Sequence, residues 1–348
     1  MNYPGGVPVW PDGKRFAFTI VDDTDFATLQ TIKPVYDFLY DQGLRTTKTV
    51  WPLAPTERCI LGGDSLQNPD YLRWVMDLEQ QGFEIAYHGT TDHTSTRSRI
   101  VEGFRYFREV LGHDARLHVN HVGQRESIHW GASRFNGLSR VVYQTLQSAR
   151  RSDAHYWGDV DTSPYFWGDL CRDHITYVRN FVFRDINTLK IDPFMPYHDP
   201  RRPYVKYWFS ASHGAVGSSF CDTLHEANQD RLVAEGGACI MYAHLACGFH
   251  DGTRLLPRFR QLMQRLAGLP GWFVPASTLL DFLRQRPSWR PEPEPHYLQR
   301  LQWNWLFSRM VSSTTRLARQ VGNGGGGNGT APSETRVEDE AATSNSRA

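Results

Sequence analysis

The sequence predicts an α/β protein whose strands and helices alternate to form a parallel, closed or nearly closed β/α barrel. Two observations support this fold class. Apolar runs of strand length alternate with segments of helical periodicity in roughly seven units, a pattern that favours a parallel sheet with right-handed crossovers. No Gly-x-Gly-x-x-Gly motif follows the first strand, which counts against the alternative, an open doubly wound sheet of the dinucleotide-binding type.

The first half of the barrel begins with a strand that ends at the carboxylates of Asp22, Asp23 and Asp25. Its aromatic and β-branched residues are apolar on both faces, as in a strand that is covered on both sides. Helical spacing follows at 26–42 and stops at Gly43, a suitable C-cap. The same reasoning predicts further strands at 46–51, 83–87 and 116–121, and helices from 68 or 70 to about 82, at 95–111 and at 138–150.

The second half is less regular. Residues 156–160 are expected to form a short strand, and 165–203 an insertion that borders the active face. The insertion is expected because β-like pieces such as 178–183 are mixed there with many Pro, Asp and His residues. Regular alternation then returns, with strands predicted at 204–210, 238–243 and 271–275 and helices at 223–235, 255–266 and 277–286.

These elements assign residues 1–286 to the barrel. Residues 287–321 are predicted to form a Pro-rich linker and an amphipathic helix at 296–318. The apolar face of this helix can pack back on the barrel or against a second copy in a homo-oligomer. Residues 322–348 are rich in Gly, Asn, Ser and Glu, which predicts a disordered tail.

Composition excludes several classes of protein. The formal net charge of the 348 residues is +1, so no global field attracts nucleic acid or an anionic membrane. No apolar run is long enough to span a bilayer, and the N-terminal residues lack the apolar core of a signal peptide. The five cysteines form no Cys-x-x-Cys pair, which argues against a disulfide framework or a cysteine-type zinc site. We therefore expect a cytoplasmic protein.

Polar side chains follow three predicted strands: Asp22 and Asp23, then His88 with His93, and finally His244. In a parallel barrel all strands end on one face, so these residues should converge. One Asp and two His with open positions suit a catalytic Zn²⁺ or a similar divalent ion. Taken singly, each has a structural alternative, since an Asp at this place can cap a helix and a His can be a hydrogen-bonded structural residue.

Several short motifs resemble those of the NodB-type polysaccharide deacetylases, carbohydrate esterase family 4. The run Thr-Ile-Val-Asp-Asp at 19–23 resembles their Thr-Phe-Asp-Asp motif, and 88–93 resembles their His-x-x-x-His motif. Residues 240–245 resemble their late Leu-x-His motif, and 272–277 their closing strand and helix. The resemblance covers about 16–283 and rests on the order and spacing of the motifs.

The resemblance implies a distorted (β/α)7 barrel, a divalent metal and an N-acetylated sugar substrate. Zinc is the expected metal, with cobalt, iron, nickel and manganese as alternatives. By matching positions, Asp23, His88 and His93 would be the metal ligands. Asp22 would be the general base and His244 the general acid.

The sequence departs from the family pattern in three places. Four residues separate His88 from His93 where the family has three, so Asp92 is an alternative ligand. The Arg-x-Pro motif, whose Arg orients the catalytic Asp, is absent, which leaves Asn120 or His121, with Arg125, as candidates for that role. The family's Asp-x-x-Asp-Trp segment is at best partly matched at 157–161, where Asp159 or Asp161 could orient His244.

These features predict an enzyme, a metal-dependent hydrolase of C–N bonds other than peptide bonds. It would remove an acetyl or related acyl group from an N-acylated sugar or glycan precursor. A second hypothesis keeps the chemistry but changes the substrate to a non-sugar, cyclic amide. A third hypothesis, of another class, is a catalytically silent barrel that binds a glycan or a protein.

Overall fold

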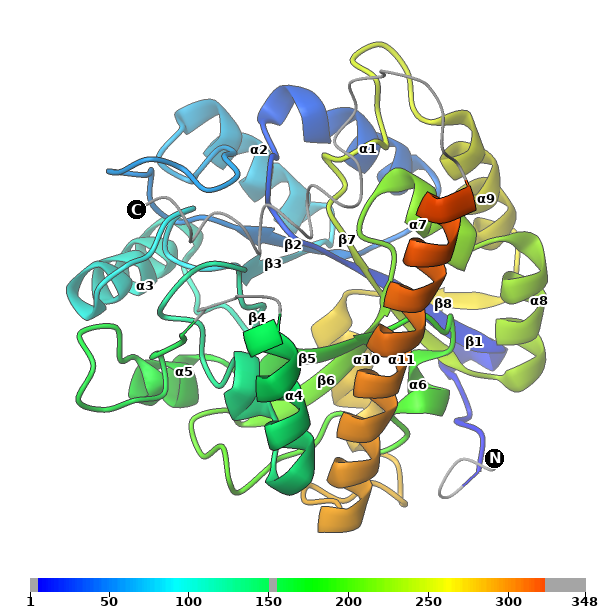
Figure 1. Cartoon of the computed structure of the whole chain (residues 1–348). Coiled ribbons are helices and arrows are strands. Elements are labelled where there is room, and N and C mark those ends of the chain that lie inside the picture. The colour runs from blue at the N-terminus through cyan, green and yellow to red at the C-terminus, as the bar shows by residue number, and fades with distance from the viewer. Residues whose placement is uncertain (1–5, 150–154, 323–348) are drawn as a thin grey trace.

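The computed structural model describes residues 6–149 and 155–322 (Figure 1). Seven parallel strands form a closed barrel in chain order, because the last of them pairs with the first and the first with the second. They are β1 (Phe16–Asp22), β2 (Thr47–Val50), β3 (Glu84–Tyr87), β4 (Leu117–His118), β5 (Tyr177–Phe183), β6 (Tyr207–His213) and β7 (Ala238–Ala243). The (β/α)7-type barrel expected from the sequence is confirmed.

An eighth strand, β8 (Gly271–Phe273), distorts the barrel. It pairs with β1 from Phe16 to Phe18, whereas β2 pairs with the end of β1, at Val21 and Asp22. The two strands therefore share one edge of β1. A second distortion affects β7, where the backbone N–H of Ile240 donates to Oγ1 of Thr188 at 3.0 Å instead of to a neighbouring strand.

Helices surround the barrel (Figure 1). They are α1 (Leu29–Asp41), α2 (Pro69–Gln80), α3 (Arg97–Leu111), α4 (Gly137–Ala149), α5 (Gly168–His174), α6 (Thr188–Ile191), α7 (Gly217–Thr223), α8 (Glu226–Glu235), α9 (Pro257–Ala267), α10 (Ala276–Arg284) and α11 (Pro295–Gly322), with 3-10 turns η1 (Pro11–Gly13) and η2 (Gly131–Arg134). Local sequence sets their ends. Thr28 caps α1 through a capping box, Asn68 caps α2, and Gly112 ends α3 in the left-handed conformation.

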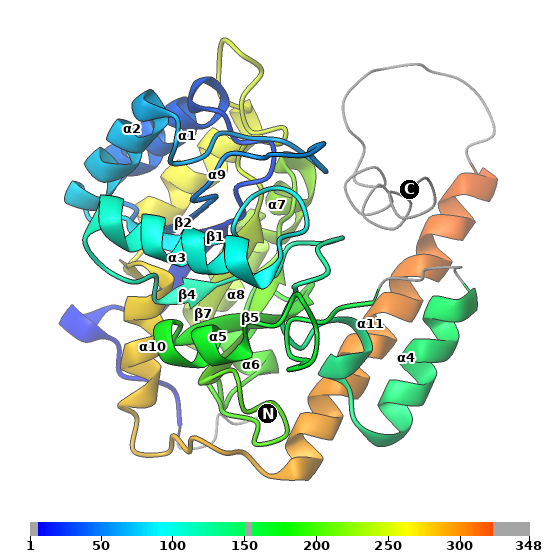
Figure 2. The same cartoon turned by 90° about the vertical axis from the view of Figure 1, so that its left-hand side faces the viewer.

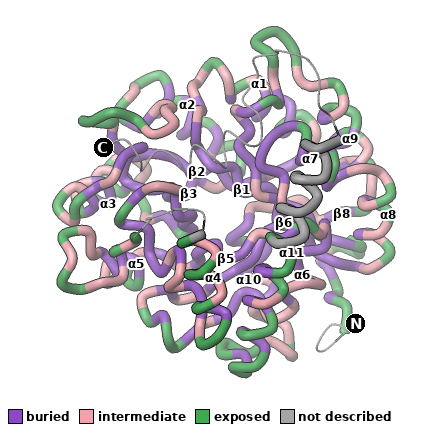
Figure 3. Tube along the Cα trace, in the orientation of Figure 1, coloured by how far each residue is buried: buried purple, intermediate pink, exposed green. Residues whose placement is uncertain are grey.

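Side chains on the strands point alternately into the barrel and out toward the helices. One buried cluster unites Val21, Ala86, Leu117, Tyr177 and Ile240 from five different strands, which can meet only in the barrel interior. The residues between them on the strands, such as Phe18, Ile20 and Met241, belong to a second cluster with the surrounding helices. Figure 3 shows the strands mostly buried, and their few remaining residues are of intermediate burial, whereas exposed residues lie on the outer helices and loops.

Three elements differ from their predictions. The predicted strand at 156–160 is a turn, where Gly158 passes so close to the Glu126 backbone that a Cβ would lie 2.0 Å from its carbonyl oxygen. The predicted insertion at 165–203 contains β5, a full barrel strand. The helix predicted at 223–235 is α8, which begins at Glu226, and a further helix that was not predicted, α7, precedes it at Gly217–Thr223.

The C-terminal helix α11 packs back on the protein, which is one of the two arrangements that its sequence left open. Leu298, Leu301 and Trp305 join the outer core, and α11 contacts α4 and β5. Figure 2 shows α11 and α4 side by side at one edge of the barrel. The tail predicted to be disordered falls, from 323 on, outside the described residues. Within 6–149 and 155–322, no helix combines the length and apolarity needed to cross a membrane.

Candidate active site

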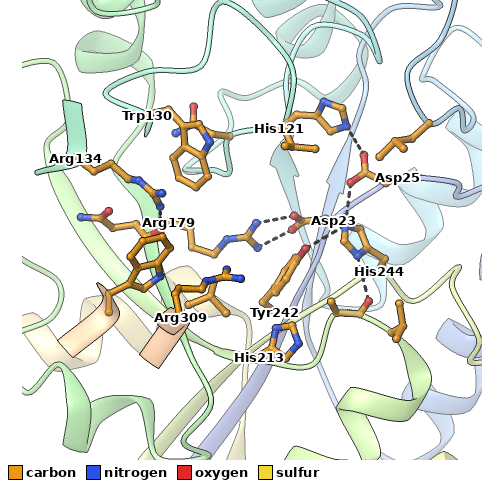
Figure 4. A pocket seen from close by; sticks show the side chains of 18 residues that line it. Asp23, Asp25, His121, Trp130, Arg134, Arg179, His213, Tyr242, His244 and Arg309 are labelled. Atoms are coloured by element: carbon orange, nitrogen blue, oxygen red, sulfur yellow. Dashed lines mark hydrogen bonds and ion pairs between the residues drawn. The ribbon is translucent and has the colours of Figure 1, made fainter. Parts of the chain in front are cut away.

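A pocket of about 240 Å³ opens at the carboxyl ends of the strands (Figure 4). Its walls come from residues at or just after the ends of β1, β4, β6 and β7, from within β5, from η2 and α11, and from Leu61 in the loop after β2. Polar residues dominate one part of the lining: Asp23, Asp25, Asn120, His121, Arg179, His213 and His244. This is the face on which parallel barrels carry their chemistry.

Three imidazoles converge on the carboxylate of Asp25. The Nε2 atoms of His88 and His121 lie 3.3 and 3.0 Å from its Oδ1, and Nε2 of His244 lies 2.9 Å from its Oδ2. All four side chains are buried. The residue after Asp25, Phe26, has a φ of +60°, an uncommon conformation for an aromatic residue that turns the chain immediately beyond the carboxylate.

The ring of Trp51 holds two of these imidazoles in place. Its centre lies 4.6 Å from that of His88 and 5.2 Å from that of His121. The Nδ1 atoms of both histidines make no hydrogen bond within the described chain. Packing against the indole therefore orients these rings, in place of the outer hydrogen bond that a metal-binding histidine usually makes.

Mutual charge shifts the pKa values of this cluster. Burial by itself would raise the pKa of the Asp25 carboxyl, but His121 and His88 hold it well below its ordinary value. Burial lowers the pKa of His88, against the opposing pull of Asp25. For His244 burial acts in the same downward direction, but the hydrogen bond and charge of Asp25 prevail and raise the pKa. Asp25 is therefore ionised and His244 favours its protonated form.

The neighbouring aspartates at the end of β1, Asp22 in the strand and Asp23 just after it, face opposite sides of the barrel wall. Asp23 lies on the inner side, where Arg179 binds both of its oxygens at 2.7 and 2.6 Å. Asp22 lies on the outer side, between the sheet and α1, where it accepts from Tyr36 and pairs with Lys48 at 3.1 Å. Asp22, predicted to be the general base, does not line the pocket.

His93, predicted to be a ligand, lies apart from the Asp25 cluster. Its Nε2 accepts from the backbone N–H of Thr56 at 3.0 Å, and its Nδ1 lies 2.9 Å from the carbonyl oxygen of Thr94. The alternative ligand Asp92 accepts from the backbone N–H groups of Leu61 and Gly62. Both side chains thus hold loops together.

The residues predicted to bind substrate or orient the catalytic groups take three different places. His121 is part of the Asp25 cluster. Asn120 lines the pocket and ties down its own loop by exchanging two hydrogen bonds with Ile128. Asp161 is exposed in a turn, and its neighbour Asp159 pairs with His129 at 2.8 Å.

The donor set around Asp25 fits a divalent metal ion. A metal with ligands at about 2.1 Å brings neighbouring donor atoms to about 3.0–3.4 Å from one another, close to the spacing seen between Asp25 Oδ1 and the two histidines. The Nε2 of His121 is not aligned for a hydrogen bond to Asp25 despite its 3.0 Å distance. Two imidazoles and one carboxylate form a set used by catalytic zinc and iron sites.

Sequence reasoning assigned no role to Asp25 and did not single out Arg179. Arg179 carried a usable signal, since it interrupts the apolar run Tyr177–Phe183, and a charge inside a buried strand needs a partner. Asp25 continues the inward alternation of Val21 and Asp23 past the strand end, which becomes visible only once the inner face of β1 is known.

Comparison with known proteins found matches among solved structures alone. No protein-family profile and no curated protein matches the sequence. Among solved structures, a "putative polysaccharide deacetylase" from Mycobacterium smegmatis is 12% identical, with 84% of this chain and 98% of that chain covered and a TM-score of 0.47. Puue allantoinase is also 12% identical, over 83% of this chain and 99% of its own, with a TM-score of 0.44. At this level of similarity these likenesses say nothing about what the present chain does.

Proposed function

We propose that this protein is a metal-dependent hydrolase that removes an acetyl or related acyl group from an N-acylated sugar. The observation that carries the proposal is the convergence of His88, His121 and His244 on Asp25, beside a second carboxylate, Asp23, that an arginine holds in place. The roles differ from those expected from the sequence. Asp25 and His121 replace Asp23 and His93 as ligands, and Asp23 replaces Asp22 as the base.

Asp25, His88 and His121 would hold the metal, which when bound polarises the amide carbonyl and lowers the pKa of its water. The three residues come from different loops, after β1, β3 and β4, so the closed barrel brings them together. Each is almost fully buried. The surrounding protein therefore fixes their positions before a metal or substrate arrives.

Asp23 is suited to accept the proton of the attacking water. Arg179 binds its two oxygens side by side, and a carboxylate with about four lone-pair positions keeps two of them free in such a pair. Its backbone N–H donates to the carbonyl of Ala243 at 2.8 Å, which extends the β1–β7 pairing and places Asp23 beside His244.

His244 is suited to give a proton to the departing nitrogen. Its Nδ1 faces the carbonyl oxygen of Ala215 at 3.1 Å, and its Nε2 faces Asp25 Oδ2 at 2.9 Å. Because both acceptors lack protons, an imidazole satisfies them together only when both ring nitrogens carry hydrogen. The raised pKa of His244 agrees with this protonated form.

The pocket suits one sugar residue. Its volume of about 240 Å³ lies just below the range of about 300–1,000 Å³ typical of drug-sized ligands. The aromatic rings of Trp130, Tyr242 and Trp305 line it beside the amide of Asn180. Sugars are commonly bound by such a combination of aromatic faces and hydrogen-bonding groups.

The proposal is tested with purified protein that is stripped of metal and reloaded with zinc, cobalt, iron, nickel or manganese in turn. Acetate release from N-acetylglucosamine and its oligomers is measured against ring opening of a cyclic amide such as hydantoin. We expect chelator-sensitive acetate release. Ring opening alone would favour the cyclic-amide hypothesis, and a protein that binds none of these metals would favour the silent barrel.

Two histidine variants form a matched pair for the ligand assignment. His121→Ala should lose at least about a hundredfold in metal affinity, since even outer-shell partners contribute about 10–100-fold. His93→Ala removes a histidine from the same mouth of the barrel and should retain the metal. The reverse pattern would return His93 to the ligand set and reject the geometry proposed here.

A further inference from the structure

Arg134, the last residue of η2, carries a buried positive charge on the wall of the pocket. Only 5% of the residue is exposed. Its guanidinium carbon lies 3.9 Å from the ring centre of Trp130 and 4.9 Å from that of Trp305. Figure 4 shows Arg134, Trp130 and Arg309 on one side of the pocket, with Arg179 and Asp23 between them and the Asp25 cluster.

No carboxylate forms an ion pair with Arg134 within residues 6–149 and 155–322. Its Nη1 donates to the carbonyl oxygen of Asn180 at 3.4 Å, and its Nε is buried and makes no hydrogen bond there. Burial lowers the pKa of the Arg134 guanidinium. The phenol of Tyr143 raises this pKa, whereas the like charge of Arg309 lowers it further. Arg179, in contrast, is neutralised by Asp23.

A buried guanidinium without an anion is costly unless something else compensates for it. The two indoles compensate in part by cation–π attraction, but they leave the planar donor edge of the side chain without a carboxylate or phosphate, the groups to which it is best matched. Arg309, an exposed residue near the middle of α11, lines the same pocket. Positive charge therefore gathers on the side of the pocket away from the Asp25 cluster.

We propose that the substrate is an acidic N-acylated sugar whose carboxylate or phosphate binds Arg134, with Arg309 at the pocket rim, while its acyl group reaches the Asp25 cluster. This inference rests on the function proposed above and adds the class of substrate. A neutral sugar leaves the Arg134 charge unpaired. An acidic one supplies the bidentate partner that the described protein does not.

The test uses full-length protein and three sugars that share an N-acetyl group. N-acetylglucosamine is neutral, N-acetylglucosamine 1-phosphate carries a phosphate, and N-acetylmuramic acid carries a carboxylate. Affinity is measured by calorimetry and by tryptophan fluorescence on metal-free protein, and kcat/KM for acetate release on metal-loaded protein. We expect one of the acidic sugars to bind at least about tenfold more tightly than the neutral one, the range of a charge-assisted hydrogen-bonded pair.

Arg134→Gln should remove this preference, and Arg309→Gln should weaken it. Arg254→Gln is the control for net charge, since Arg254 is exposed and pairs with Asp251 outside the pocket. Arg134→Lys keeps the charge but not the planar fork, and should retain only part of the preference. Equal affinity of the wild type for the three sugars overturns the inference, whether or not the Arg134 variants fold.

The same measurements separate this inference from the proposed function. An Arg134-dependent preference for acidic sugars without acetate release from any of them supports the anion site and rejects the hydrolase. Acetate release that shows no preference for acidic sugars supports the hydrolase and rejects the anion site. If both acidic sugars bind equally well, the site recognises negative charge, whereas a preference between them identifies phosphate or carboxylate as the natural group.

Discussion

Asp22 and Asp25 carry the same functional group only three positions apart, yet the structure predicts different effects of their removal on metal binding. In Asp25→Asn the proposed metal site would lose the carboxylate around which His88 and His121 are arranged. In Asp22→Asn the pocket is untouched, but Lys48 loses its carboxylate partner on the outer side of the sheet. Metal affinity should therefore distinguish the two variants.

The magnitudes follow from burial and contacts. The side chains of Lys48 and Asp22 are both 0% exposed, and removing one partner of such a pair costs about 3–5 kcal/mol of stability. This corresponds to a melting temperature lower by about 6–10 °C, at about 2 °C per kcal/mol. Asp25→Asn should instead lower metal affinity by at least about a hundredfold, more than the loss of an outer-shell partner.

The assay combines metal content after equilibrium dialysis with thermal unfolding of the metal-free proteins. Wild type and Asp22→Asn should retain one metal ion per chain under conditions in which Asp25→Asn retains almost none. Asp22→Asn should show the large loss of melting temperature and still keep the metal. The assignment of the two faces of β1 is refuted if folded Asp22→Asn loses the metal, or if Asp25→Asn keeps a full equivalent.

Three further variants test the remaining parts of the site and fold. Asp23→Asn should keep the metal but lower kcat by about 10²–10⁴-fold, the usual contribution of a general base, and a near-normal rate would place the base elsewhere. Glu126→Gln should flatten the pH dependence of stability. Burial raises the pKa of Glu126 to about 8, so the folded state binds the proton more tightly than the unfolded chain does. Wild-type stability should then fall by up to about 5 kcal/mol as the pH rises from about 4.5 to 8, and equal slopes in chemical denaturation of both proteins would contradict this. Trp305→Ala should cost about 3–5 kcal/mol, since the residue is 7% exposed within the outer core, and an unchanged unfolding midpoint would show that α11 does not pack on the barrel.

Most of the barrel could be predicted because its signals are local. The β7 bounds Ala238–Ala243 coincide with the predicted range, since a short apolar run between Gly237 and His244 leaves little choice. The strand β5 was harder to recognise, because Arg179 and Asn180 give its inner face the polarity of a loop. Those polar residues are where the pocket reaches into the barrel, so the missing signal was itself part of the site.

The sequence by itself determined that strands and helices alternate and that acidic and imidazole side chains follow the strands. Only the tertiary structure decided which of those side chains meet. A strand covered on both faces has apolar residues at odd and even positions alike, so nothing in the run 16–22 distinguishes its inward residues from its outward ones. Barrel closure makes that choice when it turns Val21, Asp23 and Asp25 inward and pairs Asp22 with Lys48 outside. The same closure brings His121, 33 residues beyond His88, beside it, while His93 stays in its loop.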